Sequence, residues 1–183
     1  EGSIGPVAGS SHHSLFTRMP GVKVYAPMTP YEWHVAYNEF MGGDDVVYLS
    51  EHRGAWDNTD DDGMPDTFRG ADITLYPISI TRFAAREAAI ELEQNGIGVN
   101  IMHIRELKPL YMPYLSTAKI GIVIDDDYPG GVASDIAMQL HALTGARMHV
   151  LGLEDRTAGF AARVDNLPPD KERIKKFILD LVK

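Results

Sequence analysis

Strand-like and helix-like segments alternate along the chain from residue 71 to its end. Of all features of the sequence, this alternation limits the possible folds most strongly. Short apolar runs bounded by turn-forming residues predict strands, and apolar residues at helical spacing predict the segments between them as helices. The expected strands are residues 71–80, 98–104, 119–127 and 146–153, and the expected helices are 81–96, 130–145 and 168–183, with a short helical turn in 107–118. Alternation of this kind produces βαβ units, so we expect an α/β fold with a largely parallel sheet.

The N-terminal third shows a shorter pattern of the same kind. Residues 21–27 and 45–52 are expected strands. Between them Thr29 is a suitable N-cap, with Pro30 at the first helical position and Glu32 at the third, which is a capping-box arrangement. The apolar stripe of this expected helix is Trp33, Ala36, Tyr37 and Phe40.

Composition excludes several classes of protein. The 183 residues carry a net charge of −9 with a pI near 5.1, and nucleic acids or anionic membranes would require a basic face. The chain has no cysteine, which excludes disulfides, thiolate catalysis and cysteine-bound zinc. No apolar run approaches the roughly 20 residues of a membrane span, and the first residues do not resemble a signal peptide. We therefore expect a cytoplasmic protein, or an organellar matrix protein in a eukaryote, that binds neither nucleic acid nor membrane.

Residues 57–69 are acidic and rich in turn formers. Asn58, Asp60, Asp62 and Gly63 match four positions of an EF-hand loop, but the last ligand position is occupied by Arg69, whose charge would repel a cation. The flanking segments do not have the pattern of two helices. We therefore interpret residues 57–69 as an acidic linker.

The stretch "DDDYPGGVASD", residues 125–135, follows the most apolar expected strand. Ligands of open α/β sheets bind beyond the carboxyl ends of strands, and glycines before a helix can bind an anion. However, the glycines match no phosphate-binding motif, and three aspartates would repel a phosphate. From the residues alone, a tight turn with helix capping is favoured over a binding site.

Two adjacent histidines, His12 and His13, lie in a stretch of small residues that we expect to be a loop. A loop imidazole can hold or transfer a proton near neutral pH, so these residues fit a functional pair and a surface pair equally well. The other five histidines form no metal-binding motif, and no third ligand lies near the pair at a recognisable spacing. We therefore expect no metal site.

Four stretches resemble the β subunit of thiamine-diphosphate-dependent 2-oxo acid dehydrogenases, the E1 component, within the transketolase superfamily. "MPGVKVYAPMTPYE" (19–32) carries the most specific similarity. "SSHHS" (10–14) resembles the loop that holds the active-site histidine in that family, and "VVYLSEH" (46–52) and "IVIDDDYPGGVASDIA" (122–137) resemble later segments. The resemblance follows the family's order over nearly the whole chain.

The resemblance implies three parts. Residues 1–56 would be the second half of a pyrimidine-binding domain, 57–69 a linker, and 70–183 a three-layer transketolase C-terminal-like domain with mostly parallel sheets. His12 would be the family's active-site histidine, which moves protons or holds the acyl intermediate near the thiazolium, and His13 would be its companion. No cofactor-binding residue of this chain is identified.

The resemblance also implies partners. The glutamate that contacts the aminopyrimidine ring corresponds to no residue of this sequence, and the motif for Mg²⁺ and diphosphate belongs to another subunit. Thiamine diphosphate and Mg²⁺ would be held largely by an E1 α-like subunit, or by a chain carrying the remaining half domain, or by both. A lipoyl acyltransferase core would be a further partner, and the isolated chain is expected to be inactive.

Two alternatives stay open. The short His-His stretch also resembles deoxyxylulose-phosphate synthases, so a ketol transferase is one alternative. Phosphosugar substrates would require basic residues near His12, and only Arg18 and Lys23 are close in sequence. The other alternative is a non-catalytic assembly module of the same fold.

Overall fold

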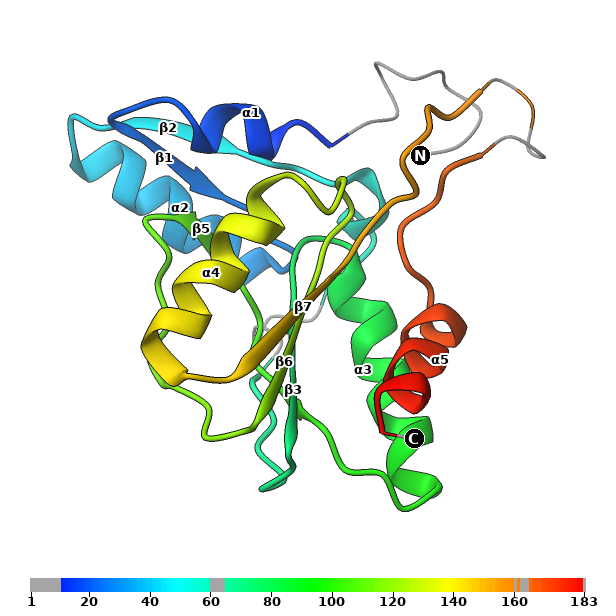
Figure 1. The fold of residues 1–183 in the computed structure, drawn as a ribbon. Coiled ribbons are helices and arrows are strands. Elements are labelled where there is room, and N and C mark those ends of the chain that lie inside the picture. Colours follow the sequence, from blue (N-terminus) through cyan, green and yellow to red (C-terminus); the bar gives the residue numbers. More distant parts are fainter. Residues whose placement is uncertain (1–10, 60–64, 160, 162–164, 183) are drawn as a thin grey trace.

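The computed structural model describes residues 11–59, 65–159, 161 and 165–182 (Figure 1). Its strands form two sheets. Sheet A has the order β2-β1-β5, and sheet B has the order β4-β3-β6-β7. No helix in the described ranges is long and apolar enough to cross a membrane.

Sheet B is fully parallel and forms the centre of a three-layer structure. Its strands are β3 (Ile73–Pro77), β4 (Asn100–Ile101), β6 (Ile120–Ile124) and β7 (Arg147–Leu151). The helices are α3 (Thr81–Gln94) and α5 (Lys171–Leu181) on one face and α4 (Val132–Thr144) on the other (Figure 1). The predicted α/β architecture with a mostly parallel sheet is therefore confirmed.

Alternation along the strands of sheet B explains the two cores. Successive side chains of a strand point to opposite faces. Leu75, Ile122 and Ile124 pack with apolar residues of α3 and α5, whereas Tyr76 and Val123 pack with residues of α4. Because both faces are covered, the central strands β3 and β6 are mostly apolar and buried, which is typical of parallel sheets.

Sheet A combines strands from distant parts of the chain. β1 (Val22–Tyr25) pairs in parallel with β2 (Val46–Leu49) and antiparallel with β5 (Glu106–Lys108). The helical turn expected in 107–118 was wrong, because residues 106–108 extend as a strand to pair with β1. The expected C-terminal part thus contributes a strand to the sheet of the N-terminal part.

Sheet A is joined to the α4 side of sheet B. Val24 and Ala26 of the first part lie in one apolar core with Leu107, Val123 and residues of α4. In Figure 1, sheet A and α1 (His13–Thr17) lie across the end of sheet B at which β6 leads into α4. The two sheets therefore meet at the carboxyl ends of the parallel strands.

Several predicted helix ends are confirmed. Thr29 Oγ1 accepts a hydrogen bond from the backbone N–H of Glu32 at the start of α2 (Pro30–Gly42), and Asp170 caps α5 in the same way through Arg173. Gly145 ends α4 with a φ of +72°, a conformation that glycine adopts readily. By contrast, α1 replaces the expected loop at His13.

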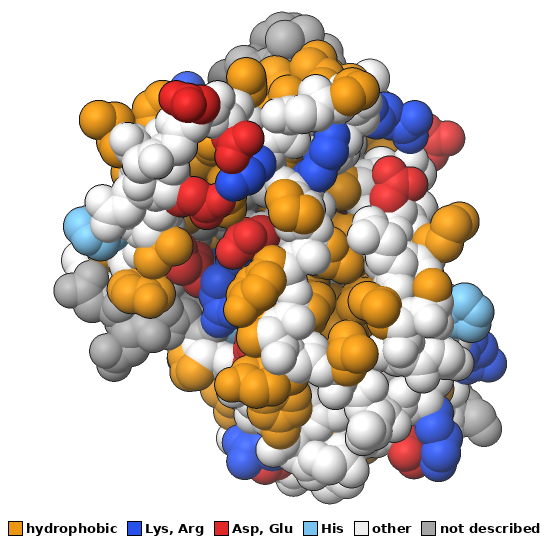
Figure 2. Space-filling model, turned by 90° about the vertical axis from the view of Figure 1, so that its left-hand side faces the viewer, with side chains coloured by type: hydrophobic (Ala, Val, Ile, Leu, Met, Phe, Trp, Pro, Cys, Tyr) orange, Lys and Arg blue, Asp and Glu red, His pale blue; other side chains and the backbone are white. Residues whose placement is uncertain are grey.

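The apolar stripe expected on α2 is not a core face. Trp33 is half-buried and Tyr37 and Phe40 are exposed, so Ala36 is the only stripe residue that is buried. Figure 2 shows the side of the molecule on which α2 and α4 lie, and hydrophobic side chains are spread over it. The exposed side chains of Tyr37 and Phe40 are part of this apolar surface.

The buried anchor of α2 is Glu32 rather than its aromatic stripe. The carboxylate of Glu32 accepts two hydrogen bonds from Arg82 of α3, at 2.6 and 2.7 Å, and one from Arg105 Nε at 2.9 Å. It also accepts the backbone N–H of Met28 rather than that of Thr29, so only the Thr29 half of the expected capping box forms. Burial by itself raises the pKa of Glu32. The two arginines and the Met28 N–H lower it by more, so the pKa lies below its usual value.

The described ends of the expected linker contact the segment that follows β1 and the strand β4 of sheet B. The Asn58 side-chain amide donates to the Met28 carbonyl at 2.8 Å, and Thr67 forms a β-bridge with Ile101. Asp60, Asp62 and Gly63 of the EF-hand comparison lie outside the described residues. Arg69 forms an ion pair with Glu93, at 3.2 Å.

We predict that Glu32→Gln destabilises the protein by about 3–5 kcal/mol, because it leaves the fully buried Arg82 guanidinium without a countercharge. Urea denaturation measures the change. Lys176→Gln is the control, since it removes an exposed ion pair with Asp180 and should change the unfolding free energy little. Equal effects of the two substitutions would contradict a structural role for the Glu32–Arg82 pair.

Candidate functional site

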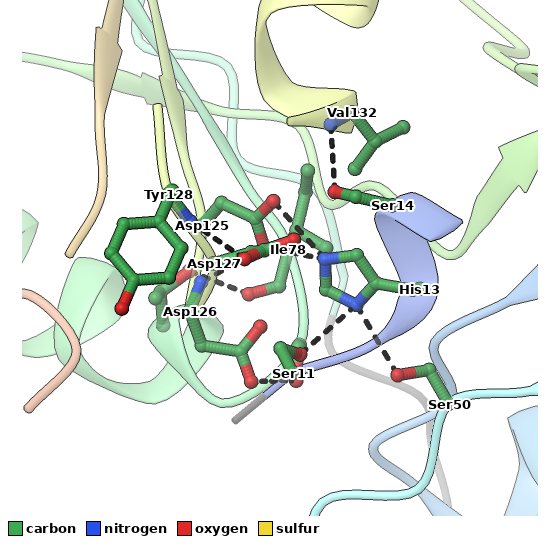
Figure 3. Close-up of polar contacts among 12 residues, drawn as sticks. Ser11, His13, Ser14, Ser50, Ile78, Asp125, Asp126, Asp127, Tyr128 and Val132 are labelled. Carbon is green, nitrogen blue, oxygen red and sulfur yellow. Dashed lines mark hydrogen bonds and ion pairs between the residues drawn. The ribbon is translucent and has the colours of Figure 1, made fainter. Parts of the chain in front are cut away.

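A buried polar cluster lies where α1 meets the carboxyl end of β6 (Figure 3). It contains His13 of α1 and the three aspartates that follow β6, Asp125, Asp126 and Asp127. The exposed fractions of these four side chains are between 0 and 7%. Buried charged groups are stable only with partners, and each of these side chains has at least one.

His13 holds three segments together. Its Nε2 lies 3.1 Å from both carboxylate oxygens of Asp125, which is 112 positions further along the chain. Its Nδ1 lies 3.2 Å from the hydroxyls of Ser11 and Ser50. Since Ser50 directly follows β2, one imidazole connects α1, the end of β2 and the end of β6 (Figure 3).

The aspartates have different partners. Asp125 Oδ1 accepts the backbone N–H of Asp126 at 2.8 Å, and Asp127 Oδ1 accepts that of Tyr128 at 2.7 Å. Asp126 Oδ2 accepts a hydrogen bond from Ser79 Oγ at 2.9 Å, whereas Asp126 Oδ1 has no partner within the described parts of the chain. Ser79 has a φ of +53°, which is uncommon for a residue with a side chain.

The electrostatics of the cluster follow from burial and mutual charge. Burial by itself lowers the pKa of His13, but the adjacent Asp125 carboxylate, with smaller contributions from Asp126 and Asp127, raises it to about 9. The pKa of Asp126 is raised to about 7. Burial is the largest cause, His13 opposes the increase, and the neighbouring Asp125 adds to it. At neutral pH the cluster therefore contains a protonated imidazole and a carboxyl group that ionises with difficulty.

A second contact fixes α1 to α4. Ser14 Oγ accepts the first backbone N–H of α4, that of Val132, at 2.8 Å. Gly131, the N-cap residue, has no side chain that could make this bond. A Cβ atom placed on Gly131 would collide with Ser14 Oγ, so glycine at this position allows the close approach.

The structure distinguishes His12 from His13. His12 lies just before α1, its side chain is half-buried, and its backbone carbonyl accepts the N–H of Leu15. His13 is fully enclosed by the cluster. Of the two histidines singled out in the sequence, His12 therefore has the side chain that a ligand outside the cluster can reach.

Sequence reasoning missed the connection between the two motifs. The turn after β6 does contain a tight turn, with Gly131 N–H donating to the Tyr128 carbonyl, and α4 is capped, but by Ser14 from α1. One of the aspartates, Asp125, contacts His13 directly, which the spacing of the residues did not indicate. One feature of the sequence could have indicated this contact. Carboxylates at the carboxyl end of a parallel strand lie where loops from other segments converge.

The cluster also places two carboxylates beside His13, which the sequence did not indicate. Ligand atoms of His13, Asp125 and Asp126 all lie within 4.8 Å of one another. The expectation of no metal site depended on the lack of a third ligand near the pair. The fold provides two carboxylates at this position.

We predict that Gly131→Ala destabilises the protein by about 1–3 kcal/mol, because the added methyl group collides with Ser14 and displaces α1. Gly130→Ala is the matched control, since a Cβ on Gly130 meets no atom within 4 Å. Thermal unfolding of the two variants measures the difference. If both variants unfold alike, α1 does not dock on the start of α4 as described.

Comparison with known proteins identifies relatives of the chain. The sequence model of the family described as "Transketolase, C-terminal domain" matches residues 67–174. The β subunit of 2-oxoisovalerate dehydrogenase from Bacillus subtilis is 29% identical over 73% of this chain and 47% of that protein. 1-Deoxy-D-xylulose-5-phosphate synthase 1 of Geobacter sulfurreducens is 27% identical over 81% of this chain and 26% of that protein.

Solved structures agree with the fold. A split-gene transketolase, solved as an inactive β4 tetramer, superposes with a TM-score of 0.64 over 92% of this chain and 59% of its own, at 16% identity. A transketolase from Campylobacter jejuni gives 0.68 over 98% of this chain and 29% of its own, at 15% identity. The chain spans about half the length of the curated β-subunit relatives that it matches.

Proposed function

Since the chain belongs to the transketolase C-terminal domain family, we propose that it forms part of a thiamine-diphosphate-dependent 2-oxo acid dehydrogenase or decarboxylase of the E1 β type. Relatives named as β subunits support this proposal, among them those of 2-oxoisovalerate dehydrogenase and pyruvate dehydrogenase. The observation that carries it is the junction of the two sheets, where His13 is fixed by Asp125 and His12 stays accessible.

His12 is the catalytic residue of this proposal. Thiamine diphosphate supplies the electron sink that stabilises the carbanion formed when a 2-oxo acid loses CO₂. The imidazole of His12 would hold or transfer a proton as negative charge appears and disappears on the acyl group. His13 is a positioning residue, because its two ring nitrogens are already engaged with Asp125 and the two serines.

Residues outside this sequence would hold most of the cofactor. Within the described residues, the His13 cluster contains three carboxylates and no lysine or arginine, so it does not fit a diphosphate group. Lys23, the closest lysine to His12 in sequence, pairs with Glu39 and Asp45. We therefore propose that Mg²⁺ and the diphosphate are bound by an E1 α-like subunit, by a chain with the remaining half domain, or by both.

The exposed apolar surface of the N-terminal part supports association with such a partner. Tyr37, Phe40 and Met41 of α2 and Val46 of β2 have exposed fractions between 45 and 78%. β2 is also an edge strand of sheet A, with backbone groups available for a further strand. A subunit that covered this surface would complete the layer around sheet A, and a lipoyl acyltransferase core would be a further partner of the assembly.

Transfer of a ketol unit between phosphosugars is the second candidate, supported by the deoxyxylulose-phosphate synthase relative. Of the two basic residues close to His12 in sequence, Lys23 pairs with two carboxylates and Arg18 is exposed. A phosphate substrate requires an available cation near His12, so the pairing of Lys23 weighs against this candidate and Arg18 is the residue that could serve it. A non-catalytic module of the same fold is the third candidate. The three proposals differ in whether the assembly decarboxylates a 2-oxo acid, transfers a ketol group, or does neither.

We predict that His12→Ala lowers the turnover of the assembled complex more than tenfold, while thiamine diphosphate stays bound. Steady-state 2-oxo acid decarboxylation and cofactor retention after gel filtration are the two measurements. His141→Ala is the control, because His141 is an exposed histidine nine positions beyond Val132 on α4.

Three other outcomes would redirect the proposal. An unchanged rate in His12→Ala would remove His12 from the mechanism. Activity with phosphosugars instead of 2-oxo acids would favour the ketol transferase. If the purified assembly retains neither a partner chain nor thiamine diphosphate, the non-catalytic module is the correct description.

A further inference from the structure

One buried oxygen of Asp126 has no partner in the part of the chain that the structure describes. Asp126 is 1% exposed, and its Oδ1 has no hydrogen-bond partner within the described residues. Leaving a carboxylate oxygen unsatisfied in a buried site is costly, and such an atom in a native protein indicates a missing proton, water or ion. In the ranges that the structure describes, no lysine or arginine forms an ion pair with Asp125, Asp126 or Asp127.

The atoms around this oxygen are arranged as the ligands of one ion. One ligand atom each of His13, Asp125 and Asp126 lies within 4.8 Å of the other two, and all three side chains are buried. Two ligands of a common ion are at most about 4.4 Å apart, because each coordination bond is about 2.0–2.2 Å long. The three atoms therefore need to approach one another by at most a few tenths of an ångström to share an ion. Figure 3 shows the three side chains converging from α1 and from the end of β6.

Each candidate ligand is oriented through its other atom. Ser79 Oγ binds Asp126 Oδ2, and the backbone N–H of Asp126 binds Asp125 Oδ1. His13 Nδ1 lies 3.2 Å from two serine hydroxyls. This leaves Asp126 Oδ1, Asp125 Oδ2 and His13 Nε2 for an ion, and hydrogen bonds to the distal atoms of ligands are typical of metal sites.

We propose that His13, Asp125 and Asp126 bind one divalent transition-metal ion, which replaces the proton between His13 and Asp125 and joins α1 to the end of β6. An imidazole nitrogen with two carboxylates suits Zn²⁺ or Mn²⁺, whereas Mg²⁺ and Ca²⁺ prefer oxygen ligands alone. The site is separate from the chemistry proposed for His12. It would bind an ion whichever reaction the assembly catalyses.

Metal titration of the purified protein tests this site. After treatment with EDTA and buffer exchange, isothermal titration with ZnCl₂ should show one site per chain, and Zn²⁺ should raise the melting temperature. Asp126→Asn should weaken Zn²⁺ binding at least tenfold and abolish this rise. Asp127→Asn is the matched control and should bind as the unsubstituted protein does, because the adjacent Asp127 is not one of the three ligands.

Two further measurements keep the test decisive. His13→Gln is a second ligand variant, and circular dichroism shows whether each variant is folded. Zn²⁺ affinity that is unchanged in both folded variants would overturn the proposal and would assign the binding to other acidic residues, such as those of the 57–69 segment. Absence of binding to the unsubstituted protein, or equal affinity for Mg²⁺ and Zn²⁺, would overturn it as well.

Discussion

The contact between His13 and Asp125 is the interaction on which the junction of the two sheets depends. It connects residues 112 positions apart and lies entirely away from solvent. The neighbouring contact of Ser14 with the start of α4 uses the same short helix. Together they place α1 at the carboxyl ends of the parallel strands, where ligands of α/β proteins usually bind.

This contact also explains why His12 and His13 differ although they are adjacent. Consecutive residues at the start of a helix point in different directions, so fixing one imidazole inside the cluster leaves the other nearer the surface. The buried residue then determines where the accessible one lies. The proposed chemistry of His12 therefore depends on the polar cluster that holds His13.

Much of the fold was predictable from the sequence, because sheet B follows from local patterns. Its central strands β3 and β6 are mostly apolar runs. Thr29, Gly145 and Asp170 mark helix ends through interactions with residues close by in sequence. β5 was not predictable in this way, because three residues before a proline become a strand only by pairing with β1. The buried face of α2 was predicted wrongly for a related reason. Helical spacing shows that residues share a face, but only the tertiary structure shows that Glu32 and Ala36 are the buried ones.

The candidate site was predictable in its parts and not in its assembly. The histidine pair and the aspartates after β6 each stood out, since both combine polar residues with glycine or serine neighbours. Their connection depends on how α1 packs against the end of β6, and no spacing in a single sequence encodes that distance. Ser79 and Ser50 were missed because a lone serine after an apolar strand is common in proteins.

If the His13–Asp125 pair couples the two sheets, its two residues are coupled energetically, and a double-mutant cycle tests this most directly. The unfolding free energies of His13→Gln, Asp125→Asn and the double variant would be measured by urea denaturation in the presence of EDTA. A coupling energy of about 1–3 kcal/mol is expected for a buried pair in direct contact. Additivity of the two single effects within about 0.5 kcal/mol would contradict the account.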